Sequence, residues 1–302
     1  MAWIGVDENG LGPRLGPMVV TGVAMTTRCD AAAFLRASQA AGIGDSKGLC
    51  AHGAMGEVEG FVLAVLEVHL GLRVETFSGL VAALCLDDDA ALRVRCPEGA
   101  APSACFDEAI ALPAFGAGVT PALRARAEAL AAAGVAVSGA RFALACARRL
   151  RDARDLGQSR FDVDLGDMLR LVARLGAGAA SHEVACGKVG GRNKYAAALE
   201  ALSPLVSIEV ESSALSRYQV PGLGRIAFVR DGDATEPAVA MASLLGKYVR
   251  ELAMLRHNRF YQARVEGLVA ASGYHDPVTA RFVDATALVR ARLGIDDRCF
   301  ER

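Results

Sequence analysis

Short apolar runs bounded by glycine, proline or charged residues recur along the chain, and such runs are typical of strands. They predict strands at residues 2–7, 18–25, 72–76, 183–186, 206–210 and 225–229. A connection rich in glycine and proline, residues 9–17, joins the first two. A tight connection of this kind predicts an antiparallel hairpin.

Longer segments repeat their apolar residues at helical spacing. They predict helices at residues 56–70, 123–133, 140–153, 165–175 and 237–257. One face of the last helix carries the apolar residues Val239, Ala242, Leu245, Val249 and Leu252. Thr120 followed by Pro121 predicts a helix start, since threonine caps helices and proline favours the first helical position.

The middle of the chain is the least regular part. Residues 86–120 contain a run of three aspartates and several prolines, which predicts an insertion. We interpret residues 1–302 as a single domain, with a helical insertion at about 80–160 and a helical C-terminal element at about 255–302. The order of strands, helices, short strands and a long helix predicts a mixed α/β domain around one central sheet.

Composition narrows the function classes. The formal net charge of -1 gives no global positive field, so a polyanionic partner needs a local basic patch or metal ions. Asp7 and Glu8 interrupt the N-terminal apolar stretch, and no apolar run approaches about 18 residues, so we expect neither a signal peptide nor a membrane span. None of the eight cysteines forms a Cys-x-x-Cys pair. We therefore expect reduced thiols in a cytoplasmic protein, without a disulfide framework or a zinc site.

The most informative stretch follows the first predicted strand. Asp7 and Glu8 stand side by side there, and a glycine-rich loop with Gly10, Leu11 and Gly12 comes next. Adjacent buried acids repel each other, and a divalent cation offsets that cost because hard cations bind carboxylate oxygens. The glycines let backbone amides approach a ligand closely. A solvated acidic turn is an alternative. A dinucleotide-binding loop fits less well, since this loop leads into a strand instead of a helix.

A second acidic motif precedes the long C-terminal helix. Asp233 lies four residues before Pro237, and Ser243 and Lys247 share one face of the helix that follows. If the strand at 225–229 ends beside the first strand, Asp233 meets Asp7 at one sheet edge. The alternatives are that Asp233 only caps the helix, or that Asp231 is the functional acid.

Together these motifs resemble ribonuclease HII. The run from Asp7 to Pro17, the tripeptide Asp45-Ser46-Lys47, and the segment from Asp233 through Ala242-Ser243 to Lys247 and Arg250 carry the resemblance. It implies a ribonuclease H-like fold, a mixed five-stranded sheet flanked by helices. It also implies cleavage of the RNA strand in RNA–DNA hybrids or ribonucleotide-containing duplexes.

The resemblance further implies individual roles. Asp7, Glu8 and Asp233 would hold one or two Mg²⁺ or Mn²⁺ ions and serve as the catalytic acids. The amides of Gly10, Leu11 and Gly12 would contact a ribose 2′-hydroxyl, and Tyr274 would stack on a sugar. Lys47 would contact a phosphate, and Ser243 and Lys247 would line the site.

Two positions depart from the family pattern. Leu11 stands where the family usually has arginine, and Gly187 stands where it has a further metal-binding aspartate. Possible replacements for that acid are Glu183, Asp162, Asp164 and Asp167. Glu183 is four residues away, roughly 13 Å along a strand, and the three aspartates are expected before a helix, in a region without a matching family acid. Lys188 and Arg192, in the loop after Gly187, are further candidates for phosphate binding.

Two hypotheses therefore follow. The first is a metal-dependent nuclease of the ribonuclease HII type. The second is a nucleic-acid-binding protein that has lost cleavage, which Gly187 favours and the retained acids disfavour.

Overall fold

The computed structural model describes residues 1–44, 55–96, 105, 108–177 and 181–302. The described residues form a seven-stranded sheet in the order β3-β2-β1-β4-β7-β6-β5. The strands are β1 (Ala2–Asn9), β2 (Met18–Thr27), β3 (Val135–Ala145), β4 (His182–Gly187), β5 (Ser207–Glu211), β6 (Leu215–Val220) and β7 (Gly224–Val229). β1, β4 and β7 are parallel neighbours, and the other pairs are antiparallel.

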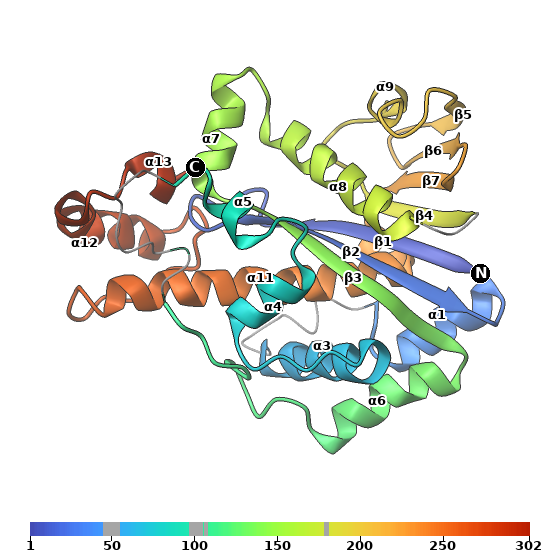
Figure 1. Ribbon diagram of the computed structural model, residues 1–302, viewed down its shortest axis with the longest axis horizontal. Helices are drawn as coiled ribbons and strands as arrows, with labels where there is room; N and C mark the ends of the chain where they lie inside the picture. The colour runs from blue at the N-terminus through green and yellow to red at the C-terminus, as the bar shows by residue number, and fades with distance from the viewer. Residues whose placement is uncertain (45–54, 97–104, 106–107, 178–180) are drawn as a thin grey trace.

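Helices cover both faces of this sheet (Figure 1). They are α1 (Ala31–Ala40), α3 (Met55–Leu70), α4 (Phe77–Leu84), α5 (Asp89–Arg93), α6 (Pro121–Ala132), α7 (Ala147–Asp155), α8 (Arg160–Gly176), α9 (Ala196–Leu199), α10 (Gly232–Thr235), α11 (Pro237–Gln262), α12 (Pro277–Leu293) and α13 (Asp297–Phe300). α3, α6 and α11 bury their apolar sides on one face of the sheet, and α8 packs on the other. No helix in the described part of the chain is long and apolar enough to cross a membrane.

The alternation of β1 explains how its two faces are used. Ile4 and Val6 are fully buried in the core that α8 covers. Gly5 points to the other face, where a Cβ atom would lie 2.0 Å from the carbonyl carbon of Ala238 in α11. Only glycine allows this close approach, which holds the start of α11 directly against β1.

The mixed fold and its flanking helices confirm the predicted fold class. The hairpin of β1 and β2 and the predicted helices at 56–70, 123–133, 165–175 and 237–257 are present with small differences in their ends. Thr120 caps α6 through the Leu123 amide, as expected, and Pro121 is the first helical residue.

Three structural expectations are wrong. The sheet has seven strands in the described residues instead of five. The segment predicted as a helix at 140–153 is divided between β3 and α7. Its alanines and arginines favour a helix locally, but Ala140, Phe142 and Ala143 pair with β2 and are buried there, so tertiary pairing overrides propensity.

The strand expected at 72–76 is also absent. This segment connects α3 to α4, and it contributes only an isolated bridge between Thr76 and Ala111. Thr76 instead caps α4, accepting a hydrogen bond from the Gly79 amide at 3.0 Å. The β-branched residues of this segment resemble a strand, but no described neighbouring strand extends along it.

Replacing Gly5 by alanine tests the contact between β1 and α11. The added methyl group meets backbone atoms that cannot rotate away, so we expect the free energy of unfolding to fall by about 2–4 kcal/mol. Gly166→Ala is the matched control, since a Cβ atom there meets nothing within 4 Å among the described residues. That helical substitution should raise stability by about 0.5–1 kcal/mol. Urea denaturation measures both, and equal stability of Gly5→Ala and the unchanged protein would contradict the packing.

Candidate active site

A cavity of about 520 Å³ opens at the carboxyl ends of β1, β4 and β7. Parallel neighbours end at the same sheet edge, so residues that are distant in sequence meet there. The residues predicted for the site that line this cavity are Asp7, Glu8, Gly187, Lys188, Asp231, Asp233, Ser243 and Lys247. The convergence expected for Asp7 and Asp233 is therefore present in the fold.

Asp7 faces α11. The hydroxyl of Ser243 donates a hydrogen bond to its carboxylate, and the positive charge of Lys247 acts on the same group. Ser243 and Lys247 are one helical turn apart, so they reach Asp7 from one side of α11. Ser243 is buried, which fixes this contact inside the protein.

Burial and neighbouring acids raise the pKa of Asp7 and Glu8. Burial raises the pKa of Asp7 to about 7, and the negative charge of Asp233 adds to this, while the Ser243 hydrogen bond and Lys247 oppose it. Burial raises the pKa of Glu8 to about 8, with contributions from Asp7 and Asp233. Carboxylates in this situation favour either protonation or a bound cation.

Asp233 lies in the first turn of α10, on the turn between β7 and α11. It does not cap α11, because the N-cap residue is Glu236, which makes no side-chain cap bond. Asp231 also lines the cavity, and its backbone is left-handed with φ 52°. Non-glycine residues rarely adopt this conformation, and such strain often accompanies functional sites.

Gly187 ends β4 beside Asp7. A Cβ atom on Gly187 would lie 2.9 Å from Asp7 Oδ1 and 3.9 Å from Glu8 Oε2. The position expected to hold an acid is therefore at the centre of the cluster, and it carries no carboxylate. Glu183 does not replace it, because Glu183 pairs with Trp3 at the other end of β4 and its carboxylate contacts Arg225 at 3.4 Å.

The three aspartates expected before a helix lie inside α8, so that placement was wrong. Asp162 forms a capping box with the N-cap residue Ser159 and accepts a hydrogen bond from Arg192 at 2.7 Å. Asp167 is fully buried and binds both Arg149 and Arg170. Asp164 is also fully buried, but neither of its oxygens has a hydrogen-bond partner among the described residues.

Asp164 is linked electrostatically to the site. Burial raises its pKa well above the usual range, and the negative charges of Glu8 and Asp7 raise it further. A sequence signal for this residue exists: it lies four residues before Met168 and seven before Leu171, within the apolar stripe of α8. An acid at a position where apolar residues are expected is buried among them, and this pattern indicates a candidate functional residue.

The glycine loop and Tyr274 lie beside α11. A Cβ atom on Gly10 would lie 2.7 Å from Arg250 Nε, and the guanidinium of Arg250 is 4.8 Å from the centre of the Tyr274 ring. The Tyr274 side chain is half exposed. The Leu11 carbonyl accepts a hydrogen bond from Arg160 at 3.0 Å. Gly12 has open space around the position of a Cβ atom within the described residues.

Lys188 and Arg192 make contacts within the protein. The Lys188 ammonium donates to Ser212 O at 2.6 Å, Ser216 Oγ at 3.0 Å and Asn193 Oδ1 at 3.0 Å. These contacts use the donors of the ammonium to hold the loop after β4. Phosphate binding by Lys188 and Arg192 stays a prediction, and Lys47 lies outside the described residues.

Comparison with known proteins agrees with these motifs. The ribonuclease HII family model matches residues 4–53. The solved ribonuclease HII of Archaeoglobus fulgidus, in a complex with PCNA, is 16% identical; the match covers 99% of this chain and 93% of that one, with a TM-score of 0.50. Ribonuclease H2 of Pyrococcus horikoshii OT3 is 15% identical, with coverage of 99% and 92% and a TM-score of 0.50.

The resemblance to ribonuclease HII is confirmed. The matched segment includes the Asp7-Glu8 motif and its glycine loop, and the solved ribonucleases share the fold along nearly the whole chain. No curated protein matches the chain in sequence.

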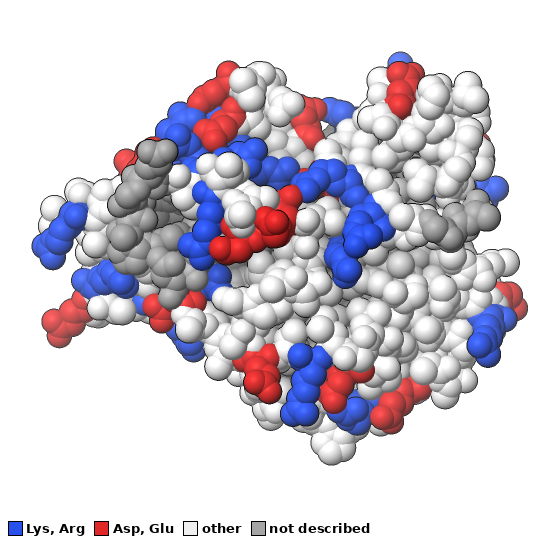
Figure 2. Space-filling view, in the orientation of Figure 1, with Lys and Arg blue, Asp and Glu red and all other residues white. Residues whose placement is uncertain are grey.

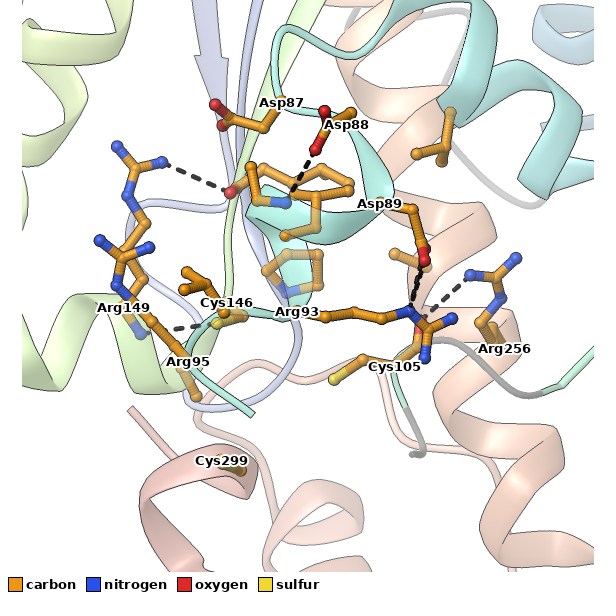
Figure 3. A pocket seen from close by; sticks show the side chains of 18 of the residues that line it. Asp87, Asp88, Asp89, Arg93, Arg95, Cys105, Cys146, Arg149, Arg256 and Cys299 are labelled. Carbon is orange, nitrogen blue, oxygen red and sulfur yellow. Dashed lines mark hydrogen bonds and ion pairs between the residues drawn. The ribbon is translucent and has the colours of Figure 1, made fainter. Parts of the chain in front are cut away.

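A second and larger cavity, about 840 Å³, lies between α5, α7, α11 and α13 and shares no lining residue with the acidic one (Figure 3). Its acids and arginines face each other, as Asp89 with Arg93 and Asp87 with Arg170. Basic and acidic side chains accordingly alternate on this face of the molecule (Figure 2). Burial raises the pKa of the Cys299 thiol to about 11, so it is not a ready thiolate. The cavity with Asp7 and Asp233 is smaller, but it is the one in which the predicted metal-binding acids converge.

The acidic cavity fits a divalent cation by its chemistry. Asp7, Glu8 and Asp233 offer hard oxygen donors, and the burial and repulsion that raise the pKa of the first two would be offset by a cation. Within the described residues, no three or more histidine, cysteine, aspartate or glutamate side chains already stand close enough to hold an ion.

The raised pKa values predict how stability depends on pH. Asp7 and Glu8 have unfolded-state values near 3.8 and 4.5 and folded values of about 7 and 8, so folding favours their protonated forms. Their contribution to stability is complete below the unfolded values and is lost as pH rises through the folded ones. In EDTA, we expect the Tm to fall between about pH 5 and about pH 9. The variant Asp7→Asn/Glu8→Gln should reduce this fall, with Asp164 contributing to the remainder, and Glu183→Gln should leave it unchanged. A double variant with an unchanged pH slope would show that the acids are not buried together.

Proposed function

We propose that this protein is a divalent-cation-dependent nuclease that cleaves the RNA strand of RNA–DNA hybrids. The observation that carries the proposal is the convergence of Asp7, Glu8 and Asp233 with Ser243 and Lys247 around one cavity. The ribonuclease H-like fold supports the reaction class. A purely structural role would not explain half-buried, mutually repelling acids, since such groups destabilise the folded chain.

Asp7, Glu8 and Asp233 would hold the cation. When bound, Mg²⁺ or Mn²⁺ supplies activation of the attacking water and charge stabilisation of the leaving oxygen. Ser243 orients Asp7 by hydrogen bonding, and Lys247 favours its ionised form. This pair thus keeps a carboxylate ready on the α11 side of the cavity.

The substrate would lie along the loop after β1. Gly12 leaves open space beside the backbone, which suits close approach of a ribose, whereas Gly10 packs against the side chain of Arg250. The half-exposed ring of Tyr274, supported by Arg250, offers a surface for stacking on the sugar or base. Leu11 contributes an amide but no charge, so we propose recognition by backbone shape at this position. Lys47 would contact a phosphate.

A nucleic-acid-binding protein without cleavage is the second candidate. Gly187 favours it, because the carboxylate expected beside Asp7 is missing. The two candidates differ in one respect that can be measured, namely turnover of a hybrid that the protein binds.

Asp7→Asn tests the proposal. With a labelled RNA–DNA hybrid and Mn²⁺, we expect the unchanged protein to cleave the RNA strand and the variant to be at least about a hundredfold slower, since a lost metal ligand removes several kcal/mol of transition-state stabilisation. Hybrid affinity should change little. Glu183→Gln is the matched control, being an acid on β4 away from the cavity.

Absence of cleavage by the unchanged protein, with hybrid binding retained, would favour the second candidate and reject the first. Equal cleavage by Asp7→Asn would show that the reaction occurs elsewhere.

A further inference from the structure

Asp164 and Asp167 are a natural pair for comparison. Both are fully buried on α8, three residues apart. Asp167 binds Arg149 Nη2 at 2.7 Å and Arg170 Nη1 at 2.9 Å, so its charge is compensated. Asp164 has no hydrogen-bond partner for either oxygen in the described part of the chain. A buried carboxylate without a partner is strongly unfavourable unless a proton or a cation compensates it.

The packing of α8 directs Asp164 toward the end of β1. Val163 and Leu165, its neighbours on α8, belong to the same buried cluster as Val6 of β1 and Cys186 of β4. These two strand residues immediately precede the site residues Asp7 and Gly187. Asp164 thus lies behind the edge of the sheet where the acidic cavity opens.

Glu8 connects the two faces of the sheet. It follows Ile4 and Val6 in the alternation of β1, so its side chain starts on the α8 face. Its carboxylate nevertheless lies near Gly187, with Oε2 3.9 Å from the Cβ position on the α11 side. The negative charge of Glu8 acts on Asp164 more strongly than that of Asp7. The acids therefore form a chain from Asp164 through Glu8 to Asp7.

We propose that Asp164 supplies the fourth carboxylate of the cation site, moved from the end of β4 to α8. This inference rests on the proposed function, since it assumes that a cation binds at Asp7 and Glu8. The chain lacks a carboxylate at Gly187 and carries an uncompensated one on the neighbouring helix. A divalent cation held by Glu8 and Asp7 would compensate the negative charge of Asp164. The Asp164 carboxylate would in turn supply a further oxygen ligand to the cation.

Mn²⁺ affinity, measured by calorimetry without nucleic acid, tests the inference. We expect Asp164→Asn to weaken Mn²⁺ binding about 10–100-fold. Asp167→Asn is the matched control and should keep the Mn²⁺ affinity of the unchanged protein. The Tm in EDTA separates the two roles further: Asp167→Asn should lower it because two arginines lose their partner, whereas Asp164→Asn should not.

Restoring a carboxylate at position 187 gives a second test. In Asp164→Asn/Gly187→Asp, we expect Mn²⁺ affinity to recover by at least about tenfold, because the new side chain lies beside Asp7 and Glu8. This variant also guards against a general folding defect of Asp164→Asn, since a misfolded protein would not regain binding.

The outcomes distinguish this inference from the function on which it rests. If Asp7→Asn abolishes Mn²⁺ binding and Asp164→Asn leaves it unchanged, Asp164 is a protonated structural acid and the inference fails alone. If the unchanged protein binds no Mn²⁺, the proposed metal-dependent function fails with it.

Discussion

The mutual repulsion of half-buried carboxylates at the end of β1 is the interaction on which the rest of this structure depends. Three parallel strands end at one edge, and this brings Asp7, Gly187 and the turn with Asp233 together. The contact at Gly5 places α11 directly against β1, so Ser243 and Lys247 reach Asp7 from that helix. The fold thus maintains a cluster of acids that is costly by itself, and a cation is the partner that best offsets the cost.

Much of this arrangement could be predicted from the sequence. The motif after the first strand and the spacing of Asp233, Pro237, Ser243 and Lys247 indicated one site, and parallel strand ends made their meeting a geometric expectation. Long amphipathic helices such as α11 were evident from apolar spacing. β3 was not, because its alanines and arginines favour a helix and only pairing with β2 decides otherwise.

Asp164 shows a different limit of sequence reasoning. The family motifs predict acids at fixed positions, and at one of these positions this chain has Gly187 instead. The carboxylate of Asp164 on α8 is linked to the site only by the electrostatic effect of Glu8 and Asp7, which are distant in sequence and belong to another element. Its place within an apolar stripe was visible, but burial without a partner is a property only of the three-dimensional structure. The departures at Leu11 and Gly187 thus alter the site without removing the acid cluster.

The location of a bound cation tests this account most directly. Crystals of the protein soaked with Mn²⁺ should give an anomalous difference peak at about 2 Å from carboxylate oxygens of Asp7 and Glu8. We expect the peak at the end of β1, with the Asp164 carboxylate turned toward it. A protein that binds Mn²⁺ only elsewhere, or whose Asp7 and Glu8 carboxylates stay without a cation at saturating Mn²⁺, would contradict the account.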